Sequence, residues 1–166
     1  MVVMESEHYD SKIARGGQDW KIQNSVTIFS GAGYMTAGPN SGVLVTSGYK
    51  TTSPELIYKV NFKKTGTYYL WLRGRGPSTY DDSIHAGLDG AALTTADKIH
   101  SFTPSWKWSR ATMDGPAASL SITSAGIHTI HLWMREDGFE VDKILLTTST
   151  SSTAPAVTGP AESVRS

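Results

Sequence analysis

Apolar residues recur at every second position along much of the chain. Ile130, Leu132 and Met134 show this spacing most clearly, and a period of two is typical of a strand with one buried face. The pattern predicts strands over residues 2–9, 56–62, 67–73, 83–88, 119–123, 127–134 and 139–146. No long segment repeats apolar residues at helical spacing, so we predict very little helix.

Turn-forming residues separate the predicted strands. Asp89-Gly90, residues 114–116 (Asp-Gly-Pro) and residues 124–126 (Ser-Ala-Gly) are examples, and these residue types favour tight turns. Short strands with such punctuation are typical of an antiparallel sandwich or barrel. We therefore predict an all-β fold, an antiparallel two-sheet β-sandwich of the jelly-roll type.

Composition divides the chain into one domain and a tail. Residues 1–147 carry the predicted strands. They include a Gly/Ser/Thr-rich loop at residues 30–53, expected to hold one or two short strands, and its length is typical of functional loops. Residues 148–166 are rich in Ser, Thr and Pro and contain no apolar series. This predicts a linker or tail that docks on nothing and joins the domain to another part of a larger protein.

The overall composition excludes several classes of protein. The chain has 166 residues, 39% of them hydrophobic, and a formal net charge of +0, which suits one packed domain and lacks the basic footprint of nucleic-acid binding. No window approaches the roughly 18 consecutive apolar residues of a membrane span. Cys is absent, so disulfides, thiol nucleophiles and cysteine–zinc sites are excluded.

A charged turn joins the last two predicted strands. It is the run Arg135-Glu136-Asp137-Gly138, and charges gathered at a turn between apolar strands favour a binding site over a core position. The alternative is an exposed turn with an internal ion pair that contributes little to stability.

Several short motifs occur in a fixed order along the chain. They are Glu5-Ser6-Glu7, residues 66–73 (Gly-Thr-Tyr-Tyr-Leu-Trp-Leu-Arg), Leu88-Asp89-Gly90, Trp106-Lys107-Trp108, residues 125–130 (Ala-Gly-Ile-His-Thr-Ile) and residues 139–144 (Phe-Glu-Val-Asp-Lys-Ile). This order resembles the carbohydrate-binding modules of families 6 and 35, which are galactose-binding-domain-like sandwiches appended to secreted bacterial enzymes that degrade polysaccharides. The resemblance covers residues 5–146. It departs from the families at Glu140, where they usually carry Asn, and in the tighter spacing of the two tryptophans.

The resemblance implies a structural calcium ion. In the resembling families, acids at the positions of Glu5, Glu7 and Asp142 hold calcium together with backbone carbonyls, and calcium prefers several oxygen ligands. Residues 5 and 7 also share one face of a strand. The residues alone leave open that the three acids are solvated charges on an edge strand, where they discourage edge pairing.

The resemblance also implies a sugar site built on an aromatic platform. Sugar rings present apolar C–H faces, so such sites combine an exposed aromatic ring with fixed hydrogen-bonding groups. Trp106 takes the position of the stacking tryptophan, Trp108 takes that of a deeper structural one, and Tyr34 in the long loop is expected as the second wall of the cleft. The alternative is that both tryptophans pack in the core.

Polar partners for the sugar are expected from neighbouring loops. The candidates are Arg135, Glu136, Asp137, Glu140, Asp82 and His85. Carboxylates and a guanidinium fork suit vicinal hydroxyls, and Arg also suits a carboxylate or a sulfate. A sheet face carrying Trp71 and Trp133 is an alternative binding surface.

A catalytic role is not expected. Asp81-Asp82 and Glu136-Asp137 are adjacent pairs, whose side chains point to opposite faces of a strand, so neither pair forms the facing carboxylates of glycoside hydrolysis. The chain also contains no Gly-x-Ser-x-Gly elbow and no phosphate loop.

Together these observations predict a non-catalytic carbohydrate-binding module of a secreted or cell-surface protein. Its partners are a polysaccharide or oligosaccharide and a covalently linked catalytic domain, with no nucleic acid and no membrane. Basic residues at 73, 75, 107, 110 and 135 favour an acidic or sulfated glycan, such as a marine one, while neutral galactans and xylans stay open. The alternatives are a small jelly-roll lyase or hydrolase, and a structural or adhesive cell-surface domain.

Overall fold

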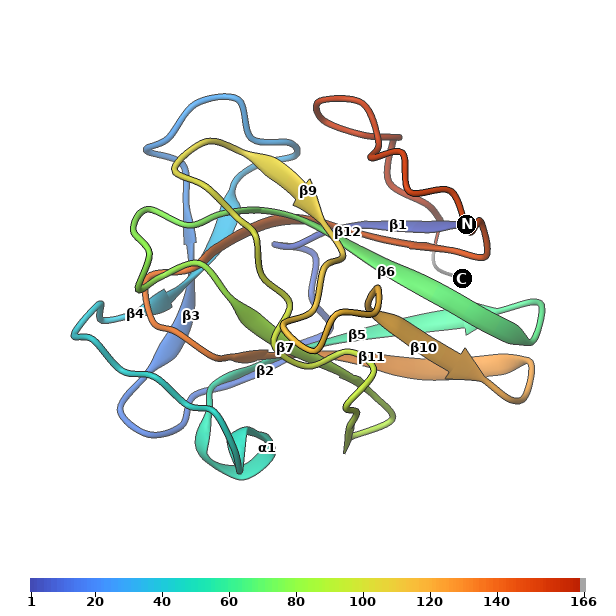
Figure 1. The fold of residues 1–166 in the computed structure, drawn as a ribbon, viewed down its shortest axis with the longest axis horizontal. Coiled ribbons are helices and arrows are strands. Elements are labelled where there is room, and N and C mark those ends of the chain that lie inside the picture. Colours follow the sequence, from blue (N-terminus) through green and yellow to red (C-terminus); the bar gives the residue numbers. More distant parts are fainter. Residues whose placement is uncertain (165–166) are drawn as a thin grey trace.

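Two antiparallel sheets pack face to face in the computed structural model, which describes residues 1–164 (Figure 1). The one α-helix in this part of the chain is the single turn α1 (Tyr49–Thr52). The predicted all-β sandwich with very little helix is therefore confirmed.

The larger sheet contains most of the residues that matter for the site. Its strands are β1 (Val2–Glu5), β3 (Asp19–Gln23), β4 (Tyr34–Gly38), β6 (Gly66–Arg75), β9 (Lys107–Ser109), β10 (Ser119–Ile122) and β12 (Glu140–Thr147). They follow the order β10-β6-β12-β4-β3, with β1 also paired to β12 and β9 to β6. The strand β3 was not predicted, because it is short and mostly polar.

The smaller sheet has five strands. Its strands are β2 (Ser11–Ile13), β5 (Glu55–Phe62), β7 (Ile84–Leu88), β8 (Ala91–Ala92) and β11 (Gly126–Met134), in the order β2-β5-β11-β7-β8. The helix α1 lies beyond the end of this sheet, at the bottom of Figure 1.

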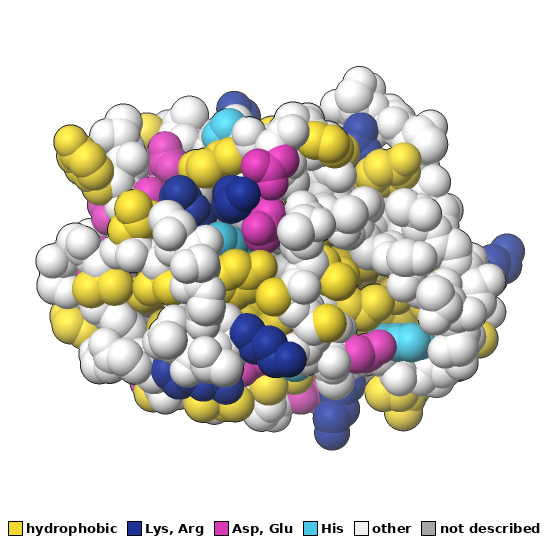
Figure 2. All heavy atoms as spheres, turned by 60° about the horizontal axis from the view of Figure 1, so that its bottom comes forward, with side chains coloured by type: hydrophobic (Ala, Val, Ile, Leu, Met, Phe, Trp, Pro, Cys, Tyr) yellow, Lys and Arg dark blue, Asp and Glu magenta, His cyan; other side chains and the backbone are white. Residues whose placement is uncertain are grey.

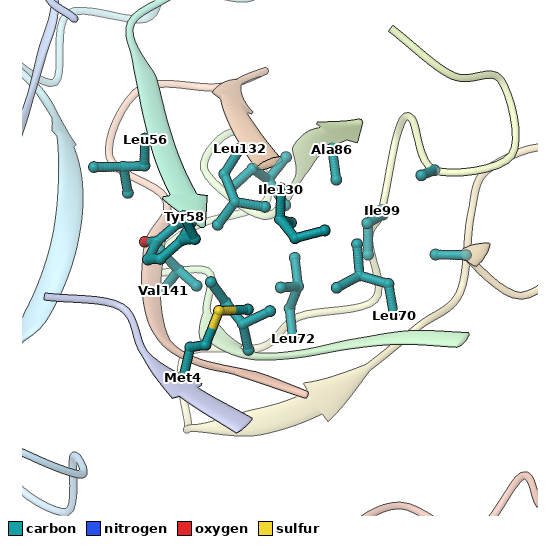
Figure 3. Packing of buried hydrophobic residues seen from close by; sticks show 14 of the residues in the cluster. Met4, Leu56, Tyr58, Leu70, Leu72, Ala86, Ile99, Ile130, Leu132 and Val141 are labelled. Atoms are coloured by element: carbon teal, nitrogen blue, oxygen red, sulfur yellow. The ribbon is translucent and has the colours of Figure 1, made fainter. Parts of the chain in front are cut away.

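The core lies between the sheets and follows the period-two pattern. Figure 3 shows Leu56, Tyr58, Ile130 and Leu132 from the smaller sheet facing Met4, Leu70 and Leu72 from the larger one. All of these side chains are fully buried. Since alternate residues of a strand face opposite sides, the inward Leu70 and Leu72 leave Trp71, Arg73 and Arg75 on the outer face of β6.

The segment after β12 folds back over that outer face, and we call residues 149–163 the C-terminal strap. Its carbonyls accept hydrogen bonds from buried side chains: Trp108 Nε1 donates to Ala156 (3.1 Å) and Arg73 Nε to Val157 (2.6 Å). Lys143 Nζ donates to Thr158 (3.0 Å). The expectation that residues 148–166 dock on nothing is thus corrected for residues 156–163. Main-chain carbonyls hold most of them, and Glu162 and Ser163 add side-chain contacts by accepting hydrogen bonds from the N–H groups of Glu5 and Val3. An apolar series is not involved, so the hydrophobic pattern carries no signal of docking.

The surface has the mixed charge that the composition predicts. On the face shown in Figure 2, many Lys and Arg side chains lie close to Asp or Glu instead of forming a patch of one sign. Over residues 1–164, no helix is long and apolar enough to cross a membrane.

Candidate functional site

Trp106 stands beside a hollow on the outer side of the larger sheet. The hollow has a volume of about 320 Å³, and its lining includes Ile28, Arg75 and the half-exposed Trp106. The indole is fixed in place, because its Nε1 donates to the Thr27 carbonyl (2.9 Å) and the Arg73 guanidinium lies 5.3 Å from the ring centre. A held, partly exposed indole next to a hollow is what a stacking platform requires.

Ile28 forms part of the rim and has an unusual backbone. Its φ is 68° and it is 66% exposed. A β-branched residue in the left-handed region is a strained conformation, costing about 1–3 kcal/mol, and such strain clusters at binding sites. The carbonyl of Ile28 accepts a hydrogen bond from Arg73 Nη2 (2.9 Å), which helps to hold it there.

Tyr34 supports the platform from behind. Its side chain is buried, its ring meets Trp106 edge-on at 5.0 Å between centroids, and its hydroxyl lies 3.1 Å from Ser25 Oγ. Because β4 turns this ring under Trp106, the ring is buried beneath the platform, and the expectation that Tyr34 forms the second wall of the cleft stays a prediction.

Arg73 ties three distant segments to the hollow. It is 1% exposed, and its guanidinium forms an ion pair with Asp142 at 2.6 Å. It also donates to the carbonyls of Ile28 and Val157. Burial raises the pKa of Asp142, and the hydrogen bonds from Ser30 and Arg73 act against that rise. Arg73 therefore positions the loop at residue 28 and the strap together.

Glu140 lies at the expected position but has a partner. Its Oε2 pairs with Arg75 Nη1 at 2.5 Å, and Arg75 Nε also donates to the Pro104 carbonyl (2.8 Å). Burial raises the pKa of Glu140, against the opposing effect of Arg75. Glu140 also lines a second hollow, of about 350 Å³, together with Lys21 and Asn40.

Asp137 forms hydrogen bonds with other groups of the chain. It is fully buried and accepts hydrogen bonds from three consecutive backbone N–H groups, at residues 41, 42 and 43 (2.7, 3.2 and 3.0 Å). Gln18 Nε2 also donates to it. The carboxylate therefore anchors the long loop, and its expected role in sugar binding stays a prediction.

Arg135 and Glu136 also form hydrogen bonds with other groups of the chain. Glu136 is buried and accepts from the Asp82 N–H (2.9 Å) and Ser83 Oγ (2.6 Å). Arg135 Nη1 donates to Ser83 Oγ (2.7 Å) and to Glu136. These charges fix the start of β7, and sugar contact by Arg135 and Glu136 stays a prediction.

His85 and Asp82 lie apart from Trp106. His85 is fully buried, stacks on Tyr49 at 3.7 Å, lies 2.9 Å from the Val45 carbonyl through Nε2, and accepts from the Lys98 N–H at Nδ1. Burial lowers its pKa to about 4, so it is neutral. Burial, together with Glu136, raises the pKa of the partly exposed Asp82. Neither residue lines either hollow.

The alternative surface carrying Trp71 and Trp133 does not exist as one face. Trp71 belongs to β6 of the larger sheet and packs in a cluster with Trp108 and Leu145, near the strap. Trp133 belongs to β11 of the smaller sheet and is fully buried. The two rings are thus in different sheets.

The three acids expected to bind calcium converge on one short segment. Ser30 N donates to Asp142 Oδ1 (2.7 Å), Ser30 Oγ to Glu5 Oε1 (2.9 Å), and Ala32 N to Glu7 Oε1 (2.6 Å). Two further oxygens, Glu5 Oε2 and Glu7 Oε2, are buried and have no hydrogen-bond partner. Buried, unpaired carboxylate oxygens fit a hard cation.

Two cations of the chain already lie at these acids. Lys143 Nζ is 2.9 Å from Glu5 Oε1, and Arg73 is paired with Asp142. In the described part of the chain, no three acidic, His or Cys side chains are grouped as metal ligands. Burial, with a contribution from Glu5, raises the pKa of Glu7. The calcium site stays a prediction, with Glu5 and Glu7 as the groups that best fit it.

Of the residues lining the second hollow, sequence reasoning assigned Glu140 alone to the site. Lys21, Gln23 and Asn40 were not singled out. The signal in the sequence is the alternation of Trp20 and Ile22 with polar neighbours, which is too short a repeat to mark β3 as a strand by itself.

The family follows from the sequence comparison. Residues 1–162 match the family described as the glycosyl hydrolase family 115 C-terminal domain. The chain belongs to this family. A curated relative of this family 115 domain, uncharacterized protein P23 of Formosa agariphila, is 35% identical over 112 residues, which make up 62% of this chain and 27% of that protein. The chain thus spans little more than a quarter of that relative.

Solved structures share the fold. The family 35 carbohydrate-binding module of Paenibacillus barcinonensis has a TM-score of 0.61 and 14% identity, over 90% of this chain and 100% of that one. The Podospora anserina GH26-CBM35 β-(1,4)-mannanase has a TM-score of 0.58 and 21% identity, over 92% of this chain and 28% of that one. The family 115 domain therefore has the sandwich fold of family 35 modules, as the motif order indicates.

Proposed function

We propose that this domain is a non-catalytic carbohydrate-binding module that holds an attached, exported enzyme on its polysaccharide. The observation that carries the proposal is the half-exposed Trp106 beside a hollow rimmed by Ile28 and Arg75. A flat aromatic face with adjacent polar groups is the arrangement that sugar recognition uses. The fold of family 35 modules supports the same conclusion.

The carboxylates near Trp106 support binding over catalysis. Glu140 is paired with Arg75 and Asp142 with Arg73, so neither is free to serve as an acid or a nucleophile in the way glycoside hydrolysis requires. An attached catalytic domain is supported by the matched family, which is a C-terminal domain of glycosyl hydrolases, and by the mannanase that carries a family 35 module. Export is proposed on the same basis.

Replacing Trp106 tests the proposal. Trp106→Ala is expected to weaken binding by about 2 kcal/mol or more, as removal of a central aromatic contact does, which is roughly thirtyfold in Kd. Affinity electrophoresis on a polysaccharide panel measures the loss, and turnover is assayed on the same panel.

Two control variants separate binding from folding. Trp106→Phe keeps an aromatic face and is expected to retain most of the binding. Trp108→Ala is expected to destabilise the fold, since Trp108 is buried and its Nε1 donates to the strap. Full binding by Trp106→Ala, or depolymerisation of a panel member by the wild type, would contradict the proposed function.

We also propose that calcium binds at Glu5 and Glu7 and stabilises the fold. A ligand of the native state raises the free energy of unfolding by about 2.7 kcal/mol at a hundredfold excess over its Kd. Chelator is expected to lower the Tm of the wild type, and Glu7→Gln is expected to remove most of that response. Asp114→Asn, at an acid paired with Lys98, is expected to keep the full response. Identical melting curves with calcium and with chelator would refute the site.

A further inference from the structure

The lining of the second hollow includes three polar side chains that have no partner among residues 1–164. Lys21, Gln23 and Asn40 are exposed around this space of about 350 Å³. Among residues 1–164, their side chains form no hydrogen bond and no ion pair. The predicted sugar partners Asp137 and Glu136 show the opposite state, because their oxygens are already bound to the chain itself. Free donors are the groups that a ligand's hydroxyls and charges can engage.

The sheet register lines up this hollow with the Trp106 hollow. Lys21 of β3 is paired with Thr36 of β4, Thr36 with Glu140 of β12, and Glu140 with Arg75 of β6. Directly opposed residues in an antiparallel pair project on the same face. The four residues therefore form a polar row across β3, β4, β12 and β6 (Figure 1), about 14 Å long at the usual strand spacing.

The ion pair in this row joins the two hollows. Glu140 lines the second hollow, Arg75 lines the Trp106 hollow, and the two side chains meet at 2.5 Å. A ligand resting on Trp106 that extends along the row passes over this pair and reaches Lys21. The row is longer than one sugar ring, so it accommodates more than the residue that stacks on Trp106.

Charge distinguishes the far end of the row. Arg73, Arg75 and Arg135 each have a carboxylate partner, so most of the basic cluster seen in the sequence is neutralised within the fold. Within residues 1–164, Lys21 has no such partner, and it lines the second hollow. None of the described residues that line this hollow is aromatic, so it suits recognition by charge and hydrogen bonds and not by stacking.

We propose that the row Lys21–Thr36–Glu140–Arg75 is a second sugar subsite, in which Lys21 binds an anionic sugar residue of a chain whose neighbouring residue stacks on Trp106. This inference rests on the proposed function. It adds that the bound sugar chain runs across the strands, and that the ligand is an oligosaccharide of at least two residues with a carboxylate or sulfate. Gln23 and Asn40 supply the neutral donors for the same residue.

The test compares charged polysaccharides with neutralised forms. Retention of the wild type is measured on glucuronoxylan, polygalacturonate, alginate and a sulfated galactan, each beside its carboxyl-reduced or desulfated form. The wild type is expected to prefer at least one charged member over its neutral form. Carboxyl-reduced and desulfated matrices show which of the two anions is bound.

A matched pair of lysine variants locates the effect. Lys21→Gln is expected to weaken binding of the preferred charged polysaccharide about tenfold, the usual share of one charge-assisted hydrogen bond, and to abolish the preference. Lys50→Gln, at an exposed lysine of α1, is expected to bind as the wild type does. Asn40→Ala is expected to weaken binding of tetrasaccharides from that polysaccharide more than binding of its monosaccharide.

Three results would contradict the second subsite. If the wild type binds and Lys21→Gln keeps both affinity and preference, the second subsite is wrong while the proposed function stands. A wild type that prefers the neutral forms also overturns the subsite. If the wild type is retained on no member of the panel, charged or neutral, the proposed function fails and the subsite fails with it.

Discussion

Deletion of residues 149–166 is expected to lower the free energy of unfolding by about 4 kcal/mol. Two buried cations lose acceptors: Arg73 loses the Val157 carbonyl, and Lys143 loses the carbonyls of Thr158 and Pro160. A hydrogen bond to a charged group contributes roughly 1.5–3 kcal/mol, and the buried Trp108 also loses its acceptor and part of its cover. The effect follows from the strap being part of the folded layer and not a free tail.

Urea-induced unfolding measures this loss, and one comparison makes it specific. Gly159→Ala is expected to lose stability in the same direction but to a smaller degree, since Gly159 has a φ of +70° and an added Cβ would lie 2.5 Å from the Trp108 ring. An unchanged midpoint for the chain ending at residue 148 would show that the strap contributes nothing.

Arg73→Met is expected to cost about 3–5 kcal/mol, the usual result of leaving one partner of a buried ion pair alone. Asp142 is fully buried, and Arg73 is the cation that neutralises it at 2.6 Å. The same change removes the donors that hold the Ile28 and Val157 carbonyls. The variant is therefore expected to lose stability and, at the same time, to distort the hollow beside Trp106.

A double-mutant cycle separates the ion pair from loss of packing. Arg73→Met/Asp142→Leu removes both charges, and it is expected to be clearly more stable than the sum of the two single changes implies. Arg73→Lys keeps the charge but not the three-way fork, so an intermediate loss is expected. Strict additivity of the two single variants would mean that the pair is not coupled.

The fold was predictable from the sequence because apolar residues alternate regularly with other residues along most strands. The alternation around Ile130 and Leu132, and the turn residues between strands, depend only on neighbouring positions. The strand β3 was missed because Trp20 and Ile22 give too short a repeat to be distinguished from a loop. The strap was missed for a different reason, since its docking uses mainly carbonyl groups, which every residue has, together with polar contacts of Glu162 and Ser163 that leave no hydrophobic pattern.

The binding residues were only partly predictable, because a charged side chain in a turn can either bind a ligand or hold another segment of the chain. Trp106 was found through its motif and does border a hollow. In the sequence, Asp137 and Glu136 cannot be distinguished from acids that bind a ligand. In the structure, they accept hydrogen bonds from the backbone N–H groups of residues 41–43 and 82. Those donors are distant in the sequence, so local patterns do not reveal that the carboxylates are already occupied.

The three-way contact of Arg73 also limits how this domain can be moved between proteins. A shortened chain that ends at Thr147 keeps every strand but loses the Val157 carbonyl that Arg73 binds. Grafting the loops around Ile28 and Trp106 onto another sandwich would transfer the visible rim without the guanidinium that holds Ile28 in its strained conformation. Engineering of chimeric enzymes with this module therefore requires the cut to fall after residue 163, with Arg73, Asp142 and Val157 transferred as one unit.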